Sequence, residues 1–77
     1  MIDYKAGDYI AYTDQNIVIL WRPYQQQHWL YMFSAVNGDS MGAIRNPELD
    51  HTDEAEWAAQ DWAEAYYIDH PQKELAL

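Results

Sequence analysis

Side chains that could carry chemistry are few in this 77-residue chain, and none lies in a pattern that would activate it. The chain has no cysteine, and its two serines, Ser34 and Ser40, have no flanking motif that would make either a nucleophile. The histidines His28, His51 and His70 are far apart, and no two are spaced as zinc ligands on one helix. We therefore expect no catalytic residue, no metal ion, no cofactor and no enzymatic activity.

Carboxylates are the one abundant reactive group. Asp50, Asp53, Glu54 and Glu56 could loosely surround a calcium ion, but the segment lacks the glycine and the ligand spacing of an EF-hand loop. Solvated acids are the favoured interpretation of this cluster.

The acids are also unevenly distributed. Of the 13 carboxylates, nine lie in residues 46–77, and only one of the four basic residues, Lys73, accompanies them, so nearly all of the net charge of −9 is in that part. Such a field repels nucleic-acid phosphates and anionic membranes, and it attracts positively charged surfaces. We expect a basic protein partner and no direct binding to nucleic acid or membrane.

The elements that position these acids follow from periodicity. Alternation, β-branched runs and turn residues predict strands over about residues 8–13, 17–22, 28–36 and 41–45 in one domain. Ile10 and Tyr12 are expected on one side of the first strand, and Pro23 is expected to end the second after Arg22. Asn37-Gly38 predicts a tight type I′ turn between the last two strands.

A helix is predicted over about residues 52–68, with Asp50 or Thr52 as its N-cap and residues 72–77 as a frayed tail. The fold class is therefore α+β, a three- to four-stranded antiparallel meander with one acidic C-terminal helix on one face. At 100° per residue, the stripe expected to face the sheet contains Ala55, Ala58, Ala59, Trp62, Ala65 and Tyr66.

The opposite side of that helix is the candidate site. Trp57 lies opposite the alanine stripe, close to Asp53, Asp61, Glu64 and Ile68 on the helical wheel, so it is expected to be exposed. An exposed tryptophan among acids suits the arginines of a basic partner. The alternative is that Trp57 folds back over a sheet edge and the acids only maintain solubility. The predicted partner-binding residues are Asp53, Glu54, Glu56, Trp57, Asp61, Glu64 and Asp69.

The second face of the sheet also needs a cover, because the central strands are apolar on both sides and one helix covers one face. The candidates are the N-terminal segment around Ile2 and Tyr4, a second copy of the chain, or the partner. Aromatic residues on the third strand could suggest an RNA platform, but the basic residues that hold an RNA backbone are missing.

A cytoplasmic location is expected. Charged residues such as Asp3 and Lys5 interrupt any apolar run near Met1, and cysteine is absent. The longest apolar run, Ile17 to Trp21, is far shorter than the roughly 20 residues needed to cross a bilayer.

The stretch Val36-Asn37-Gly38-Asp39-Ser40-Met41-Gly42-Ala43, followed after a spacer by an acidic, Trp-containing helix, resembles a stretch of one type I anti-CRISPR family. In size, charge and lack of cysteine the chain also looks like the small anti-CRISPR proteins of phages. The resemblance implies an inhibitor, acting in the host cytoplasm, that occupies a basic nucleic-acid-binding surface of a Cascade-type effector complex and so blocks recognition of target DNA.

Two alternatives remain from the sequence. One is a homodimeric structural or assembly protein of a phage or bacterium, with the apolar sheet face buried against its own copy. The other is an antitoxin-like neutraliser of a basic toxin, which would use the same acidic face.

Overall fold

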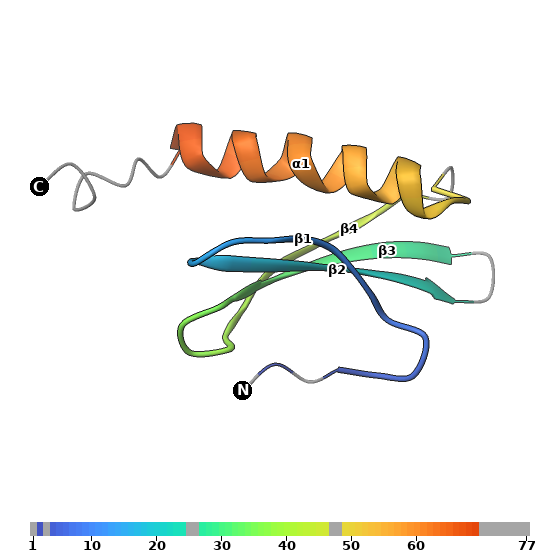
Figure 1. Cartoon of the computed structure of the whole chain (residues 1–77), viewed down its shortest axis with the longest axis horizontal. Coiled ribbons are helices and arrows are strands. Elements are labelled where there is room, and N and C mark those ends of the chain that lie inside the picture. Colours follow the sequence, from blue (N-terminus) through green and yellow to red (C-terminus); the bar gives the residue numbers. More distant parts are fainter. Residues whose placement is uncertain (1, 3, 25–26, 47–48, 70–77) are drawn as a thin grey trace, which may run out of the picture.

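The protein is described by a computed structural model covering residues 2, 4–24, 27–46 and 49–69. Its elements are β1 (Tyr9–Thr13), β2 (Ile17–Tyr24), β3 (Gln27–Ser34), β4 (Ser40–Arg45) and α1 (Thr52–Asp69). The strands form one antiparallel sheet in the order β1-β2-β3-β4, and α1 lies across one face of it (Figure 1). The predicted α+β meander with one C-terminal helix is confirmed.

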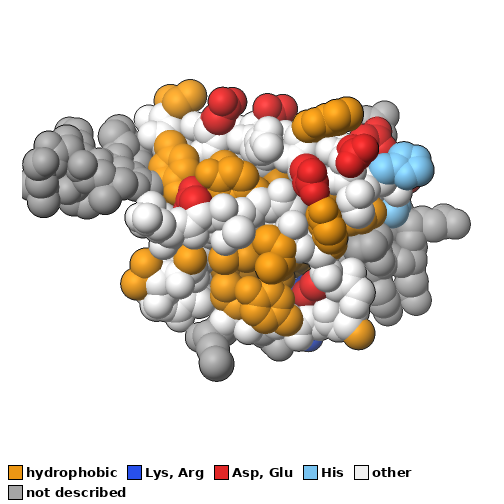
Figure 2. Space-filling model, in the orientation of Figure 1, with side chains coloured by type: hydrophobic (Ala, Val, Ile, Leu, Met, Phe, Trp, Pro, Cys, Tyr) orange, Lys and Arg blue, Asp and Glu red, His pale blue; other side chains and the backbone are white. Residues whose placement is uncertain are grey.

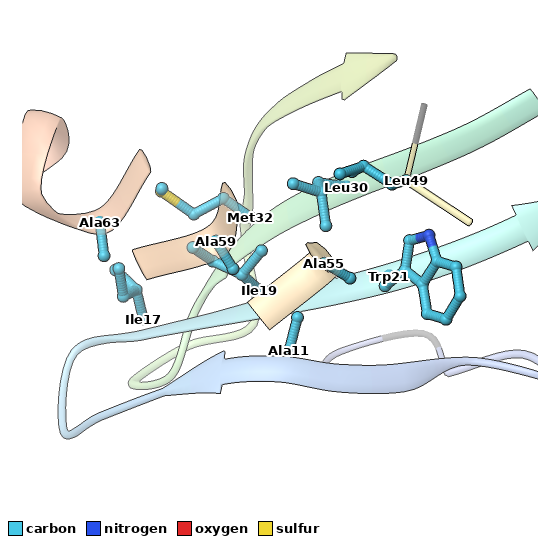
Figure 3. Close-up of a cluster of buried hydrophobic side chains, with 10 residues drawn as sticks. All are labelled: Ala11, Ile17, Ile19, Trp21, Leu30, Met32, Leu49, Ala55, Ala59 and Ala63. Atoms are coloured by element: carbon cyan, nitrogen blue, oxygen red, sulfur yellow. The ribbon is translucent and has the colours of Figure 1, made fainter. Parts of the chain in front are cut away.

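The core lies between α1 and the sheet (Figure 3). The helix contributes Ala55, Ala59 and Ala63, which recur every four residues on one side and are buried. Their small side chains let the helix approach the sheet closely, and the large apolar groups come from the strands. These are Ile17, Ile19 and Trp21 of β2 and Leu30 and Met32 of β3, with Leu49 closing the end of the core before α1. Among the described residues none that is polar or charged is buried as a whole, although the Asp8 side chain, paired with Arg22, is only 4% exposed.

The helix is rotated about its axis relative to the predicted stripe. Ala63 is buried and Ala65 is exposed, whereas the wheel placed Ala65 in the core. The rotation has a physical cause in hydrogen bonds that draw one flank of α1 toward β1 and the turn after it. Tyr9 of β1 donates to Glu56, and Tyr67 of α1 donates to Asp14.

The first strand also differs from its prediction, because it contains a bulge. Ile10 pairs with Leu20 while Tyr12 pairs with Ile19, so the register shifts at Ala11. An extra residue in one strand reverses the faces of the residues that follow it. Ile10 and Tyr12 therefore lie on opposite faces, and the expectation that they share one face is wrong.

The turn between β3 and β4 is longer than predicted. β3 ends at Ser34 and not at Val36, and residues 35–39 connect the strands in place of a two-residue turn. The Ser34 hydroxyl accepts hydrogen bonds from the backbone N–H of Val36 and Asn37, which turns the chain out of the strand early. Gly38 then adopts a φ of 81° and donates to the Ser34 carbonyl at 2.8 Å.

Two other predicted boundaries are corrected. β2 continues past Pro23 to Tyr24, because β1 pairs with β2 only as far as Trp21 and a proline is tolerated where a strand has one unpaired side. The carbonyl of His51 accepts the first helical hydrogen bond, from Ala55, so the N-cap is His51 and neither Asp50 nor Thr52. The Asp50 carboxylate instead lies 3.4 Å from Nε2 of His28. The predicted tail, residues 72–77, lies outside the described residues.

The N-terminal segment runs along the face of the sheet opposite α1 (Figure 1). Ile2 and Tyr4 border a hollow that is completed by residues 34–38. On this face Val18 and Leu20 are buried, while the β3 aromatics Trp29, Tyr31 and Phe33 are half-buried and stacked in sequence. Within a single chain the centre of the second face is therefore already covered.

Candidate functional site

The outer face of α1 presents a row of side chains directed away from the sheet. It consists of Asp53, Trp57, Asp61, Glu64 and Ile68, which lie within about 40° of Trp57 around the helix axis at 100° per residue. All five are exposed, Trp57 at 65% and Ile68 at 77%. We call this set the outer helical face.

The exposure of Trp57 decides between two interpretations of that residue. A tryptophan folded over a sheet edge or a chain terminus would be largely buried, whereas 65% of this side chain is accessible. Along the outer edge of α1, the space-filling view shows hydrophobic side chains among acidic ones (Figure 2). Trp57 therefore forms an apolar centre in an acidic surface.

Charge on the outer helical face is not neutralised by the helix itself. Its last turn has no basic residue, and in the described part of the chain no cation forms an ion pair with Asp53, Asp61 or Glu64. Asp61 and Glu64, three positions apart, repel each other by a few tenths of a kcal/mol. Folding gains nothing from this repulsion, and a cationic partner would remove it.

Among the described residues, Arg22 shows where a cation is engaged by the fold. Arg22, on the sheet face opposite α1, binds the Asp8 carboxylate in a bidentate pair, with Nε to Oδ1 at 2.6 Å and Nη2 to Oδ2 at 2.7 Å. Its guanidinium also stands 4.6 Å from the centre of the Tyr31 ring. Burial alone would raise the pKa of Asp8, but the hydrogen bond and charge of Arg22 hold it below its ordinary value. Arg22 is thus engaged by Asp8 on the face of the sheet opposite α1 and does not neutralise the outer helical face.

Three predicted site residues lie outside the outer helical face, and the first of them, Glu56, has a contact within the fold. Glu56 is half-buried and accepts a hydrogen bond from the Tyr9 hydroxyl, which ties α1 to the edge strand. That hydrogen bond is the main cause of a raised pKa of Tyr9, with desolvation and the charges of Glu56 and Asp53 adding to it. Tyr9 consequently remains a neutral donor at physiological pH, and Glu56 has a structural contact.

The other two predicted residues lie at the ends of the helix. Glu54 is half-buried in the first turn, where the helix dipole favours an acid. Asp69 is exposed in the last turn, about 120° around the axis from Trp57, and borders a pocket with Met41 and Trp62. The predicted set therefore divides into the outer helical face, the edge contact of Glu56, Glu54 in the first turn and Asp69 at the pocket.

Ile68 belongs to the face but was not in the predicted set. The signal for it was present, since it falls on the same side of the wheel as Trp57. The contact between Glu56 and Tyr9 could not be predicted from neighbouring positions, because 47 residues separate the two in the sequence.

Other chemistries find no support in the described residues. No group of three or more His, Cys, Asp or Glu side chains is placed there to hold a metal ion. None of the described helices has both the length and the apolar character needed to span a membrane.

The fold and the outer helical face together define a small α+β protein, a four-stranded meander that carries an acidic helix with an exposed tryptophan. Comparisons with protein-family models, with curated proteins and with solved structures gave no match to this chain.

Proposed function

We propose that this protein binds a basic surface of another protein through the outer helical face and inhibits it, with no catalysis of its own. The observation that carries the proposal is the exposure of Trp57 among carboxylates that have no cationic partner in the described chain. Solubility accounts for the charge of this surface, whereas an exposed Trp57 on the same face as an exposed Ile68 adds nothing to solubility.

The chemistry of such a complex follows from the side chains. An arginine of the partner can stack on the Trp57 indole and pair with Asp61 or Glu64 at the same time. Burial of the indole excludes water from those pairs, which strengthens them. Carboxylates at successive helical turns would then occupy arginines and lysines that otherwise hold phosphates.

The proposed partner is a nucleic-acid-binding protein. The resemblance to type I anti-CRISPR proteins makes this partner more specific, as the DNA-binding surface of a Cascade-type effector complex. An acidic inhibitor seated there excludes the target DNA by competition for the same cations.

The test is a competition assay with a purified, guide-loaded type I effector complex and a fluorescent target duplex. The protein is expected to displace the duplex, and Trp57→Ala is expected to weaken the inhibitor by about 2 kcal/mol or more, which is roughly 30-fold in Kd. Val36→Ala is the matched control, because Val36 is a 79% exposed apolar residue in the β3–β4 connection, outside the outer helical face. Equal loss in both variants, or in neither, would contradict the assignment of Trp57.

Charge reversal tests the acids separately. Asp61→Lys with Glu64→Lys is expected to slow association and to flatten its dependence on salt, because exposed charges act mainly on the encounter rate. An association rate that does not change with salt in the parent chain would argue against electrostatic steering.

The same experiments separate the alternatives. If the protein does not displace the duplex but binds a basic toxin, the antitoxin-like function is favoured. A tight dimer in sedimentation that ignores basic proteins would favour the assembly protein, although burial of Val18 and Leu20 within one chain weakens the structural reason for a dimer.

A further inference from the structure

A pocket of about 370 Å³ opens between the C-terminal half of α1 and strands β3 and β4. Its lining consists of Met32, Met41, Trp62, Ala65, Tyr66 and Asp69. Met32 is buried and forms part of the floor, whereas Met41, Ala65 and Asp69 are exposed at the rim. The pocket lies on a different side of the helix from the outer helical face.

Gly42 of β4 lies next to the Trp62 ring. A Cβ atom there would lie 3.4 Å from Cζ2 of Trp62, so the indole rests directly over the β4 backbone. On the other side, the Tyr66 ring meets the Tyr67 ring edge to face at 5.3 Å, which orients it. Two aromatic rings are thereby held at the wall of the pocket by packing that does not involve a ligand.

The chemistry of the lining favours a cation. Aromatic faces attract cations through their quadrupole, and the polarisable thioethers of Met41 and Met32 contact aliphatic and aromatic groups equally well. Among the described residues that line the pocket, Asp69 is the one with a charged side chain. It lies in the last turn of α1, where the negative end of the helix dipole adds to its field and no basic residue is present.

We propose that this pocket binds the guanidinium group of a single arginine side chain. A planar guanidinium can stack on the Trp62 indole while it forms hydrogen bonds with the Asp69 carboxylate, and its methylene stem can lie on Met41. A lysine ammonium would satisfy the charge but could not stack. The inference rests on the proposed function in one respect, namely that the arginine belongs to the basic partner protein.

The experiment uses a small probe, so that it does not depend on any protein partner. N-acetyl-arginine amide is titrated into the ¹⁵N-labelled full chain, and N-acetyl-citrulline amide, which has nearly the same shape without the charge, is the control ligand. Arginine is expected to produce saturable shifts in the Trp62 indole N–H and in backbone amides of residues 41–42 and 65–69. Citrulline is expected to bind about two- to fivefold more weakly, as the range for exposed ion pairs implies.

Variants of two exposed aspartates on the same helix locate the effect. Asp69→Asn is expected to lower arginine affinity about two- to fivefold, while Asp61→Asn, on the outer helical face, leaves it unchanged. Ala65→Leu places a larger helix-forming side chain at the rim and is expected to abolish the shifts without disturbing the core. Equal binding of citrulline, equal effects of the two Asn variants, or unaltered binding in Ala65→Leu would each overturn the proposal.

One rival occupant belongs to the chain itself. Lys73 follows Asp69 by four positions in the sequence. If Lys73→Gln acquired arginine binding that the parent chain lacked, the pocket would be an intramolecular lysine site, and the proposal of an external arginine would fail.

The outcome also distinguishes this inference from the proposed function. If arginine binds saturably but Trp57→Ala leaves inhibition unchanged, the role of the outer helical face is refuted and the arginine pocket is supported. If Trp57→Ala weakens inhibition but arginine does not bind, the arginine pocket is refuted and the outer helical face is supported.

Discussion

The Asp14 carboxylate joins the β1–β2 turn to the last turns of the helix, and this junction allows a prediction with a defined magnitude. The carboxylate accepts hydrogen bonds from the backbone N–H of Asn16 at 2.7 Å and of Ile17 at 2.9 Å. It also accepts from the hydroxyls of Tyr12 at 2.8 Å and of Tyr67 at 2.5 Å. Four donors on one carboxylate thus hold the hairpin and the helix together.

We predict that Tyr67→Phe destabilises the protein by about 1.5 kcal/mol, the lower range for a hydrogen bond to a charged group at a partly exposed site. For a domain of this size that lowers Tm by about 6 to 12 °C. Asp14→Asn retains an acceptor for the turn but removes the charge, and should cost about 2 kcal/mol. Because both changes act on one hydrogen bond, the double variant should show a coupling of about 1 kcal/mol.

The assay is thermal and urea denaturation followed by circular dichroism at pH 7, with Tyr4→Phe as the control for loss of an exposed tyrosine hydroxyl. Tyr4→Phe is expected to stay within about 0.5 kcal/mol of the parent chain. Strictly additive effects of Tyr67→Phe and Asp14→Asn would refute the junction.

Acid provides an independent check of the same junction. Burial alone would raise the pKa of Asp14, but hydrogen bonds from Tyr67, from the backbone of Asn16 and Ile17, and from Tyr12 lower it below its ordinary value. The stability that this carboxylate contributes is therefore fully present above about pH 4 and is lost as the pH falls through the lowered pKa. The difference between the parent chain and Asp14→Asn should shrink below pH 4, and a difference that persists at pH 2 would contradict the charge-based account. The hydrogen bond that Tyr12 donates to Asp14 raises the pKa of Tyr12 to about 12, so the Tyr12 hydroxyl remains a donor throughout this range.

Two further changes test the sheet and its connection. Gly38→Ala places an L side chain at a φ of 81° and should cost about 1 kcal/mol in urea denaturation, and an unchanged midpoint would mean that the connection relaxes without strain. Arg22→Lys removes the bidentate geometry with Asp8 and the position over Tyr31, and should cost about 1 kcal/mol at neutral pH and less in acid, because Asp8 has a lowered pKa. An Arg22→Lys variant as stable as the parent at pH 7 would show that charge alone suffices there.

Local patterns in the sequence were enough to predict the meander, the helix and the exposed side of the helix. The β-branched run of β2 and the alternation of β3 depend on near neighbours, so the strands could be located before any contact was known. The position of Trp57 opposite the alanines follows from helical geometry alone, and its exposure agrees with it. The error at the end of β3 came from a side chain that accepts hydrogen bonds from the backbone just after it, as Ser34 does.

Tertiary structure decided everything that depends on how the helix is rotated over the sheet and on how the strands are paired. The bulge at Ala11, the contact of Glu56 with Tyr9 and the bond from Tyr67 to Asp14 join residues remote in sequence, and no periodicity encodes them. The same rotation exposes Ala65, places Trp62 over Gly42 and leaves the pocket beside Asp69. The sequence by itself determined which residues share a helix or strand and where the charge accumulates, because both are properties of neighbouring positions. Only packing determined which carboxylates are engaged by the fold and which remain available to a partner.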